Sequence, residues 1–596
     1  MKRLLTALLV FFTTLSVLPA TAATQFDEQF VATPPTFTER GTGIYVNDAA
    51  ALQSEFSRLE AWTADGKEKQ KSKPLQHWIC TEYGKGDCTQ EKYVDFTSVL
   101  GLCNAQVTTD CVKSVTAVGP DGKLVTGTLV EEFPGKTQFS FPGNVAAYLP
   151  AGSSAFIVDF PTLPHAGGTQ YIVIAALSGY KQFDESVFKI DGFKAGIYAI
   201  KRLTTHPSPL NPMSTPSPEP GIPPSTLLGG GGVLGYFGYS TVNGQPTPSA
   251  CIENTLTDCA LPYPLPTDVN FSLNLKLHSK VSGWLNGRID DVQAIISADT
   301  DGDQLISVSG KPLVIPTLFK WLKKSELTPE ITAFYGNDVR NRDFSGNGYP
   351  GLINGQVIPR ADDEAPYSIL KTRLSYDEQT FKEVIAWLSA MNNTATGTPT
   401  AWSFRSVQMN DDIFFSRCLS QLNSLAGIVT TNATMYVASP PTFNQTDQSL
   451  EYKVAAAHNL PDGTEFRGRY NLLIRSEFAR CIYNYTTAPV SASVSIVSAD
   501  GGNQVATTSF GEKDGWLKFS ANNFTFSAPT IRVKLTQAKV EPVVTPVTPA
   551  APVAPAPAPQ VIPQVTKTKN ITCVKGKTIK KVSGSNPKCP VGYKLK

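Results

Sequence analysis

The sequence predicts a mainly β protein with minor helix, of the all-β or α+β class. We expect several disulfide-stapled, β-sandwich-like domains and a flexible Pro-rich C-terminal stalk. Apolar and polar residues alternate in FSLNLKL (271–277) and VSASVSIV (490–497), which is the period of a half-buried strand. The ten cysteines form an even number, as in a disulfide framework. A chain of 596 residues, 41% of them hydrophobic, has room for about three to four domains.

The charge content narrows the class of protein. Charged residues make up 17% of the chain, against about 25% in an average soluble protein. This excludes a long coiled coil and a highly charged disordered chain. The net charge of +2 gives the whole chain no basic excess of the kind that binds nucleic acid, so we expect no nucleic-acid partner.

The N-terminus has the pattern of a secretory signal peptide over 1–23. Lys2 and Arg3 precede an apolar run at 4–18, and Ala20-Thr21-Ala22 is a small-residue cleavage site. We therefore expect cleavage near Ala22 and a secreted, extracellular protein. The alternative is an uncleaved membrane anchor, but the run is shorter than the about 20 residues that span a bilayer.

The first predicted domain is a mixed domain over 24–205. LQSEFSRLEAW, within 52–64, has apolar residues near helical spacing and predicts a short helix. TQYIVIAAL (169–177) and FKAGIYAIKRL (193–203) predict two buried strands. The Pro- and Gly-rich stretch at 206–232 then predicts a linker or a long exposed loop.

A central β-rich domain is predicted over 233–425. FSLNLKL is its clearest strand, and 292–310 predicts a hairpin whose Asp301-Gly302 pair suits a type I′ turn. One helix is predicted near 376–391, because Ser375 and Glu378 have capping-box spacing. Its apolar face would hold Phe381, Val384, Ile385, Leu388 and Met391, with Asn392-Asn393 as the stop.

A C-terminal β-sandwich-like domain is predicted over 426–540. VSASVSIV and TIRVKL (530–535) alternate with period two, and Asp500-Gly501 and Asp514-Gly515 predict turns. The Pro/Ala-rich segment 541–565 follows. Repeated proline favours polyproline II, so this segment predicts a semi-rigid stalk or a plain linker.

The last 31 residues, 566–596, form a separate basic module. The module contains nine lysines and no acidic residue. With the two basic residues of the signal peptide set aside, the segment between signal and tail carries a net charge of −9 against +9 in the tail. Such a tail predicts binding to anionic wall polymers or a membrane surface. The alternative is a solvated basic tail without a partner.

The cysteines predict five disulfides. Three pairs share C-x₇-C spacing with Asp before the second cysteine: Cys80–Cys88, Cys103–Cys111 and Cys251–Cys259. Cys573 and Cys589 bracket the basic module, and Cys418 and Cys481 remain as a pair. Metal or redox chemistry is the alternative, but C-x-x-C is absent and histidines number only five.

No local motif predicts a catalytic or cofactor site. Asp299, Asp301 and Asp303 could offer carboxylates to calcium, but Gln304 and Gly310 stand where an EF-hand-type loop needs Gly and Glu. An acidic hairpin turn is the favoured interpretation of this loop.

Two S-x-x-K matches, at 178–181 and 186–189, lack the K-T-G and S-D-N companions of acyl-transfer enzymes. A distant carboxylate pair or a tryptophan-lined sugar site stays open.

Several segments carry a resemblance to known proteins. GWLNGRIDD (283–291), TTNATMYVASPPTF (430–443) and FARCIYNYTTAPVSASVSIVSADG (478–501) resemble parts of large secreted and cell-envelope proteins of actinobacteria. The tail ITCVKGKTIKKVSGSNPKCPVGYK is similar to a Lys-rich two-Cys module that follows Pro/Ala stalks in such proteins. The resemblance implies an exported, stalked architecture and a long-range bridge between Cys418 and Cys481. It carries over no catalytic residue.

Together these features favour an exported cell-envelope protein. We expect a non-enzymatic role in adhesion, scaffolding or binding of a glycan or protein ligand, with the tail attached to anionic wall polymers. A secreted hydrolase acting on polysaccharide or peptidoglycan is the alternative. Calcium-dependent adhesion through the Asp299 loop is a third interpretation.

Overall fold

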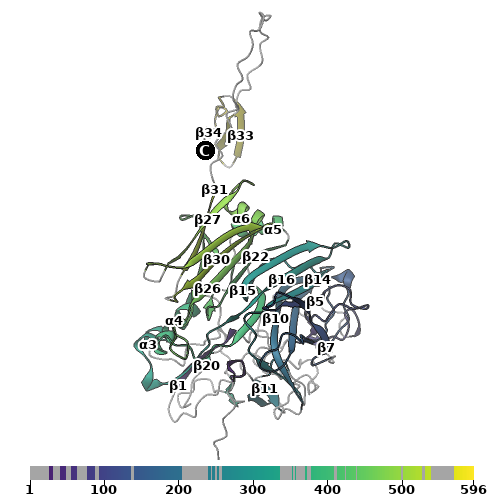
Figure 1. Ribbon diagram of the computed structural model, residues 1–596. Coiled ribbons are helices and arrows are strands. Elements are labelled where there is room, and N and C mark those ends of the chain that lie inside the picture. The colour runs from purple at the N-terminus through teal and green to yellow at the C-terminus, as the bar shows by residue number, and fades with distance from the viewer. Residues whose placement is uncertain are drawn as a thin grey trace, which may run out of the picture. The chain divides into compact units, whose positions relative to one another are not determined.

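The computed structural model separates the chain into two compact units, Met1–Ala538 and Lys539–Lys596, which are described in turn (Figure 1). The residues that the structure describes are 26–30, 41–48, 56–62, 77–86, 93–135, 140–204, 239–242, 245–248, 251–253, 258–335, 352–353, 356–357, 370–371, 378–407, 413–422, 424–437, 439–497, 501–526, 530–537, 569–576, 578–584 and 586–595.

The first unit is organised around one long main sheet. All neighbouring strands in it are antiparallel except β15 and β22, which are parallel. In spatial order the strands are β3 (His77–Ile79), β2 (Arg58–Trp62), β4 (Tyr93–Val99), β9 (Gln170–Gln182), β10 (Lys189–Leu203), β21 (Thr400–Val407), β15 (Gly283–Ala298), β22 (Leu425–Thr431), β26 (Gly468–Arg475), β30 (Trp516–Phe524) and β29 (Thr507–Lys513). Strand β8 (Phe156–Asp159) pairs with β9, and β13 (Cys259–Tyr263) pairs with β10. Strand β7 (Thr128–Glu132) pairs with β8.

A second sheet covers one face of the N-terminal half of the main sheet. Its order is β6 (Leu124–Thr126), β5 (Cys111–Val118), β14 (Asn270–Leu277), β16 (Gln304–Val314) and the second half of β15. β15 passes between the two sheets at a register shift between Asp290 and Gln293, where Asp291 has a left-handed φ of 49°. Strand β14 alternates as predicted, and its apolar side chains belong to the same buried cluster as those of β9 and β10.

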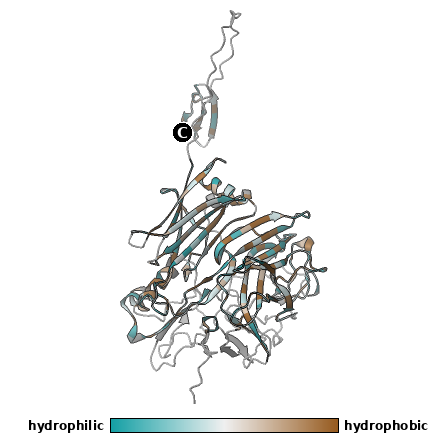
Figure 2. Cartoon of the chain, viewed as in Figure 1, coloured by the Kyte–Doolittle hydropathy of each residue, from teal (hydrophilic) through white to brown (hydrophobic). Residues whose placement is uncertain are grey.

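A third sheet covers the C-terminal half of the main sheet and completes a β-sandwich. It contains β23 (Met435–Tyr436), β25 (Ser449–Ala455), β31 (Thr530–Gln537), β27 (Val490–Val497) and β28 (Asn503–Gln504), with β24 (Thr442–Asn444) beside β25. The central strand β22 is buried along its whole length, because Ile428 faces the first core and Val429 the second. Figure 2 shows the resulting alternation of hydrophobic and hydrophilic residues along the strands.

Short helices lie beside these sheets. α5 (Ile413–Leu422) and α6 (Ser476–Tyr483) contact each other and are joined by the Cys418–Cys481 disulfide. α4 (Glu378–Ala390) contacts α3 (Pro329–Tyr335) and packs with a sheet of order β17 (Leu318–Lys323), β1 (Gly41–Val46), β20 (Leu370–Lys371). The remaining elements are η1 (Asp27–Gln29), η4 (Val145–Ala147), η6 (Lys324–Glu326), β11 (Tyr239–Val242), β12 (Gln245–Pro248), β18 (Leu352–Ile353) and β19 (Gln356–Val357).

The second unit contains a three-stranded antiparallel sheet. Its order is β33 (Thr578–Gly584), β32 (Lys569–Lys575), β34 (Lys594–Leu595), and the Cys573–Cys589 disulfide ties the loop after β33 to the central strand. Within the described part of the whole chain, no helix combines the length and the apolar character that crossing a bilayer requires.

Most predicted elements are confirmed. The two strands at 169–177 and 193–203 are β9 and β10, the hairpin is β15–β16, and β27 and β31 alternate as expected. The predicted helix is α4, and Asn392 and Asn393 end it with left-handed φ angles of 51° and 52°. Its predicted face is partly wrong, because Ile385 is exposed and Trp387 is fully buried instead.

Two local predictions are wrong. Residues 58–62 form strand β2 rather than a helix, because β3 and β4 pair with both of its edges and tertiary pairing overrides the helical spacing. The Asp301-Gly302 turn is not type I′. Ala298 pairs with Gln304, which leaves a five-residue loop in which Gly302, but not Asp301, has a positive φ.

Strands from all three predicted body segments, 24–205, 233–425 and 426–540, share the main sheet. The predicted signal peptide at 1–23, the linker at 206–232 and the stalk at 541–565 lie outside the described residues, as does the Ser375 of the predicted capping box.

Candidate functional site

The basic tail is the first candidate site, and its sheet has two different faces. Cross-strand pairing places Cys573 opposite Lys580 and Leu595, and residues directly opposite share a face. The disulfide to Cys589 therefore covers this face, and the Lys575 ammonium lies on the same side, close to Gly592. We call this the covered face of the tail sheet.

The opposite, open face of the tail sheet combines lysines with apolar residues. Val574 pairs with Ile579 and with Lys594. Lys581 pairs with Thr572, which lies on the same face as Val574 because it is two residues away. Ile579 is 59% exposed, and the two lysines are exposed. Three side chains of this face, those of Ile579, Lys581 and Lys594, are therefore exposed to solvent.

The electrostatics of the tail favour anionic partners. Five lysines on its described residues are exposed: Lys575, Lys580, Lys581, Lys588 and Lys594. Because 566–596 contains no Asp or Glu, no acidic side chain of the module can neutralise them. Exposed charges of one sign attract anions, and salt screens this attraction.

Disulfides at the predicted pairs cross-link residues within each unit. Bonds join Cys103 to Cys111, Cys251 to Cys259, Cys418 to Cys481 and Cys573 to Cys589. Cys80 is also disulfide-bonded, and its predicted partner Cys88 lies outside the described residues. These bonds indicate an oxidising environment.

The acidic loop of the β15–β16 hairpin surrounds a cation of the protein itself. The Lys276 ammonium lies 2.8 Å from Asp299 Oδ2, 3.5 Å from Asp301 Oδ2 and 3.4 Å from Asp303 Oδ2. The hydrogen bond from Lys276 holds the pKa of Asp299 below its usual value. His278 Nδ1 lies 2.9 Å from the other Asp303 oxygen. Among the described residues, no group of three or more His, Cys, Asp or Glu is arranged to hold a metal ion.

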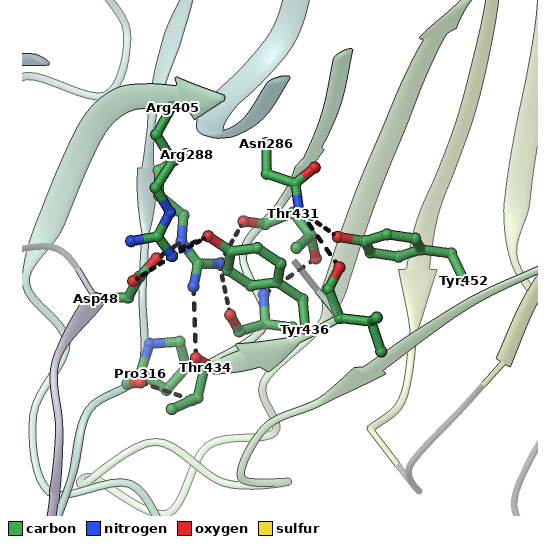
Figure 3. A network of polar contacts seen from close by, with 11 residues as sticks. Asp48, Asn286, Arg288, Pro316, Arg405, Thr431, Thr434, Tyr436 and Tyr452 are labelled. Carbon is green, nitrogen blue, oxygen red and sulfur yellow. Dashed lines mark hydrogen bonds and ion pairs between the residues drawn. The ribbon is translucent and has the colours of Figure 1, made fainter. Parts of the chain in front are cut away.

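A polar network of the body surrounds Asp48, which follows β1 (Figure 3). Arg288 Nε donates to Asp48 Oδ2 at 2.8 Å, and Arg405 Nη2 donates to Asp48 Oδ1 at 3.1 Å. The Tyr436 hydroxyl donates to Asp48 Oδ2 at 3.2 Å and accepts from Arg405. Burial alone would raise the pKa of Asp48, but the two guanidinium groups outweigh burial and lower it. Asp48 is thus held as a carboxylate.

The arginine at the centre of this network is almost completely buried. Arg288 is 1% exposed, and its guanidinium lies 4.4 Å above the ring of Tyr436. Its Nη1 donates to the carbonyls of Thr431 and Ala433, and its Nη2 to that of Thr434. A cation so enclosed is stable only with its partners in place.

A hollow beside this network contains a single carboxylate. Glu28 lines it together with Asn47, Tyr198, Tyr263 and Thr400. Glu28 Oε1 accepts from both the backbone N–H and the hydroxyl of Thr400, at 2.8 Å each. Burial raises the pKa of Glu28 and outweighs these hydrogen bonds. Among the described residues, its lining has one carboxylate and no tryptophan, which is not the lining expected of a glycosidase cleft.

The other sequence candidates are used in packing and local contacts. The Ser178 hydroxyl bonds Asp191, whereas Lys181 donates to the carbonyls of Gln182 and Glu185, so this S-x-x-K match does not pair its own residues. Four tryptophans belong to the buried cores: Trp284, Trp387, Trp402 and Trp516.

Sequence reasoning missed the Asp48 network. Its members come from distant parts of the chain and form no motif. The one available signal was an arginine within the largely apolar strand segment GWLNGRI, because a charged residue in a buried strand needs a partner.

Neither the protein-family models nor the curated proteins that were compared with the chain give a match.

Proposed function

We propose that this protein is exported to the cell envelope and held on anionic wall polymers by its basic tail, while the body acts as a non-enzymatic adhesion, scaffold or binding surface. The observation that carries the proposal is the set of exposed lysines on a disulfide-linked sheet without acidic side chains. The signal-like N-terminus and the resemblance of the tail to exported actinobacterial proteins support the same location.

The charge distribution supports attachment by the tail rather than by the body. The segment between signal and tail is negatively charged overall, so an anionic polymer is repelled by the body and attracted by the tail. A lysine near an anionic surface contributes about 1 kcal/mol. Five such lysines would therefore contribute about 5 kcal/mol, which is several thousandfold in affinity.

The test compares two full-length variants with equal loss of charge. In the tail variant, glutamine replaces Lys575, Lys580, Lys581, Lys588 and Lys594. In the matched body variant, glutamine replaces five exposed lysines of the first unit: Lys280, Lys311, Lys320, Lys382 and Lys534. The measurement is the fraction of each protein that sediments with isolated cell walls. We expect the body variant to sediment with the walls and the tail variant to stay in the supernatant. Equal binding of both variants contradicts the proposal.

Two further arms identify the ligand and the contacting face. Vesicles of phosphatidylglycerol, compared with a purified anionic wall polymer, separate a lipid surface from the wall. Glutamine at Lys581 and Lys594 removes charge from the open face, and glutamine at Lys575 and Lys580 removes the same charge from the covered face. We expect the open-face pair to weaken polymer binding more.

A further inference from the structure

The carboxylate of Asp48 is bound by groups far away in sequence. Arg288, Arg405 and Tyr436 are 240, 357 and 388 residues from it. Asp48 belongs to an N-terminal strap, which we define as residues 26–30 and 41–48. The contacts between the strap and its binding groups therefore join segments that are far apart in the sequence.

Arg288 and Tyr436 have contacts besides those with Asp48. Three carbonyls of residues 431–434 orient the Arg288 guanidinium, which also lies against the Tyr436 ring. The Thr434 hydroxyl donates to Pro316 O at 2.6 Å and fixes this loop to the body. Figure 3 shows the two guanidinium groups and the phenol converging on one side chain.

The geometry matches a small carboxylate. One carboxylate oxygen receives Arg288 Nε and the Tyr436 hydroxyl, and the other receives Arg405 Nη2. Both oxygens are thus satisfied by charge-assisted hydrogen bonds, which are the stronger kind. The side chain of Asp48 is 14% exposed, so the site is not wholly closed to solvent.

We propose that Arg288, Arg405 and Tyr436 form a preorganised carboxylate-binding site, and that the Asp48 side chain is its resident ligand. The site acts as a latch for the strap. When the Asp48 side chain is removed, the site takes a free carboxylate of matching size. Asp48→Ala removes a formate-sized group, and Asp48→Gly removes an acetate-sized group.

Asp110 provides a matched control for the buried carboxylate. It is 5% exposed, and it accepts from the backbone N–H groups of His278 and Ser279 and from the Ser279 hydroxyl. No guanidinium contact is among these bonds. Asp110→Ala therefore removes a buried carboxylate without leaving an arginine site behind.

The experiment measures thermal unfolding of the full chain in sodium formate, sodium acetate and sodium chloride at equal ionic strength. Formate should raise the Tm of Asp48→Ala saturably, acetate should raise that of Asp48→Gly, and neither should shift the wild type or Asp110→Ala. At ten times the dissociation constant, the ratio of folded to unfolded protein rises about elevenfold. Acetamide, which is neutral, should have no effect.

Several outcomes overturn the proposal. A specific site is contradicted if formate does not raise the Tm of Asp48→Ala. It is also contradicted if formate raises the Tm of Asp48→Ala, Asp110→Ala and the wild type equally. If Asp48→Ala does not fold in chloride, its refolding yield is compared in formate and chloride, and no gain in formate rejects the proposal. The double variant Asp48→Ala/Arg288→Met should lose the formate effect, and a retained effect shows that Arg288 is not the binding group.

Discussion

The charged groups of the body and of the tail differ in burial. We call Asp48 and the site formed by Arg288, Arg405 and Tyr436 the strap site. At the strap site, Arg288 is 1% exposed and its charge is balanced by Asp48. In the tail, five lysines are exposed and no acidic side chain exists to balance them. The charges at the strap site join distant segments of one chain, whereas those of the tail are exposed on a sheet without acidic side chains.

Burial explains the difference between these two regions. Two unit charges 4 Å apart interact by about 1 kcal/mol in water and about 4 kcal/mol near a protein surface with an effective dielectric constant of about 20. Desolvation offsets much of this attraction for enclosed charges, so the main consequence of burial is that removing one partner leaves the other buried and unpaired. The tail is stabilised by a covalent bond instead, because its sheet is small and Cys573 lies buried at its centre.

The largest expected effect is at the strap site. Asp48→Ala leaves the Arg288 and Arg405 guanidinium groups without their carboxylate, and breaking a buried pair in this way costs about 3–5 kcal/mol. Urea unfolding of the full chain measures this loss. A loss below about 1 kcal/mol would show that the network contributes no cohesion.

The tail disulfide should have the next largest effect. Cys573→Ser/Cys589→Ser opens a loop with a sequence separation of 16, which costs about 3 kcal/mol in the chain-entropy model. Limited proteolysis should then cut the tail while the body stays protected. If the tail of this variant stays as resistant as that of the wild type, the tail sheet does not depend on its disulfide.

The strap site should also give the body an acid-sensitive contribution. The two guanidinium groups outweigh burial and hold the pKa of Asp48 below its ordinary value of 3.8. A carboxylate with a lowered folded pKa stabilises the protein above the unfolded pKa, and this stability is lost as pH falls through the folded pKa. The Tm difference between the wild type and Asp48→Asn should be full at neutral pH and shrink below pH 3.8. A constant difference over that range contradicts the account.

The smallest effect is expected at an exposed ion pair of the body. Glu465 and Arg467 are 2.6 Å apart, closer than Asp48 and Arg288, but both side chains are 48% exposed. Glu465→Gln should cost at most about 1 kcal/mol, because exposed pairs contribute little. A loss comparable to that of Asp48→Ala would show that distance, rather than burial, decides the strength.

Strands could be predicted from the sequence where apolar and polar residues alternate along the strand itself. β14 and β31 have one buried and one solvent-facing side, so period two is visible in the sequence. The Asp-Gly dipeptide occurs in the β15–β16 and β29–β30 hairpins, and the two turns differ in length. Asp514-Gly515 forms a two-residue turn with both φ angles positive. At Asp301-Gly302, by contrast, the Asp299 carboxylate accepts from the N–H groups of Asp301 and Asp303 and widens the loop.

The remaining features depended on contacts between distant residues. The helical spacing around β2 was overridden by pairing with β3 and β4. Asp48 is one of 50 acidic residues in the chain, and its importance comes only from arginines more than 200 residues away. The lysines of the tail, by contrast, were visible in the sequence because they cluster locally.

The central claim is that exposed lysines of the tail hold the protein at the cell envelope. The most direct measurement is the fraction of protein retained by producing cells, compared between the wild type, a deletion of 566–596 and the tail variant with five glutamines. The account predicts that both altered proteins are released into the medium, and that high salt releases the wild type. Unchanged surface retention of the deletion would contradict it.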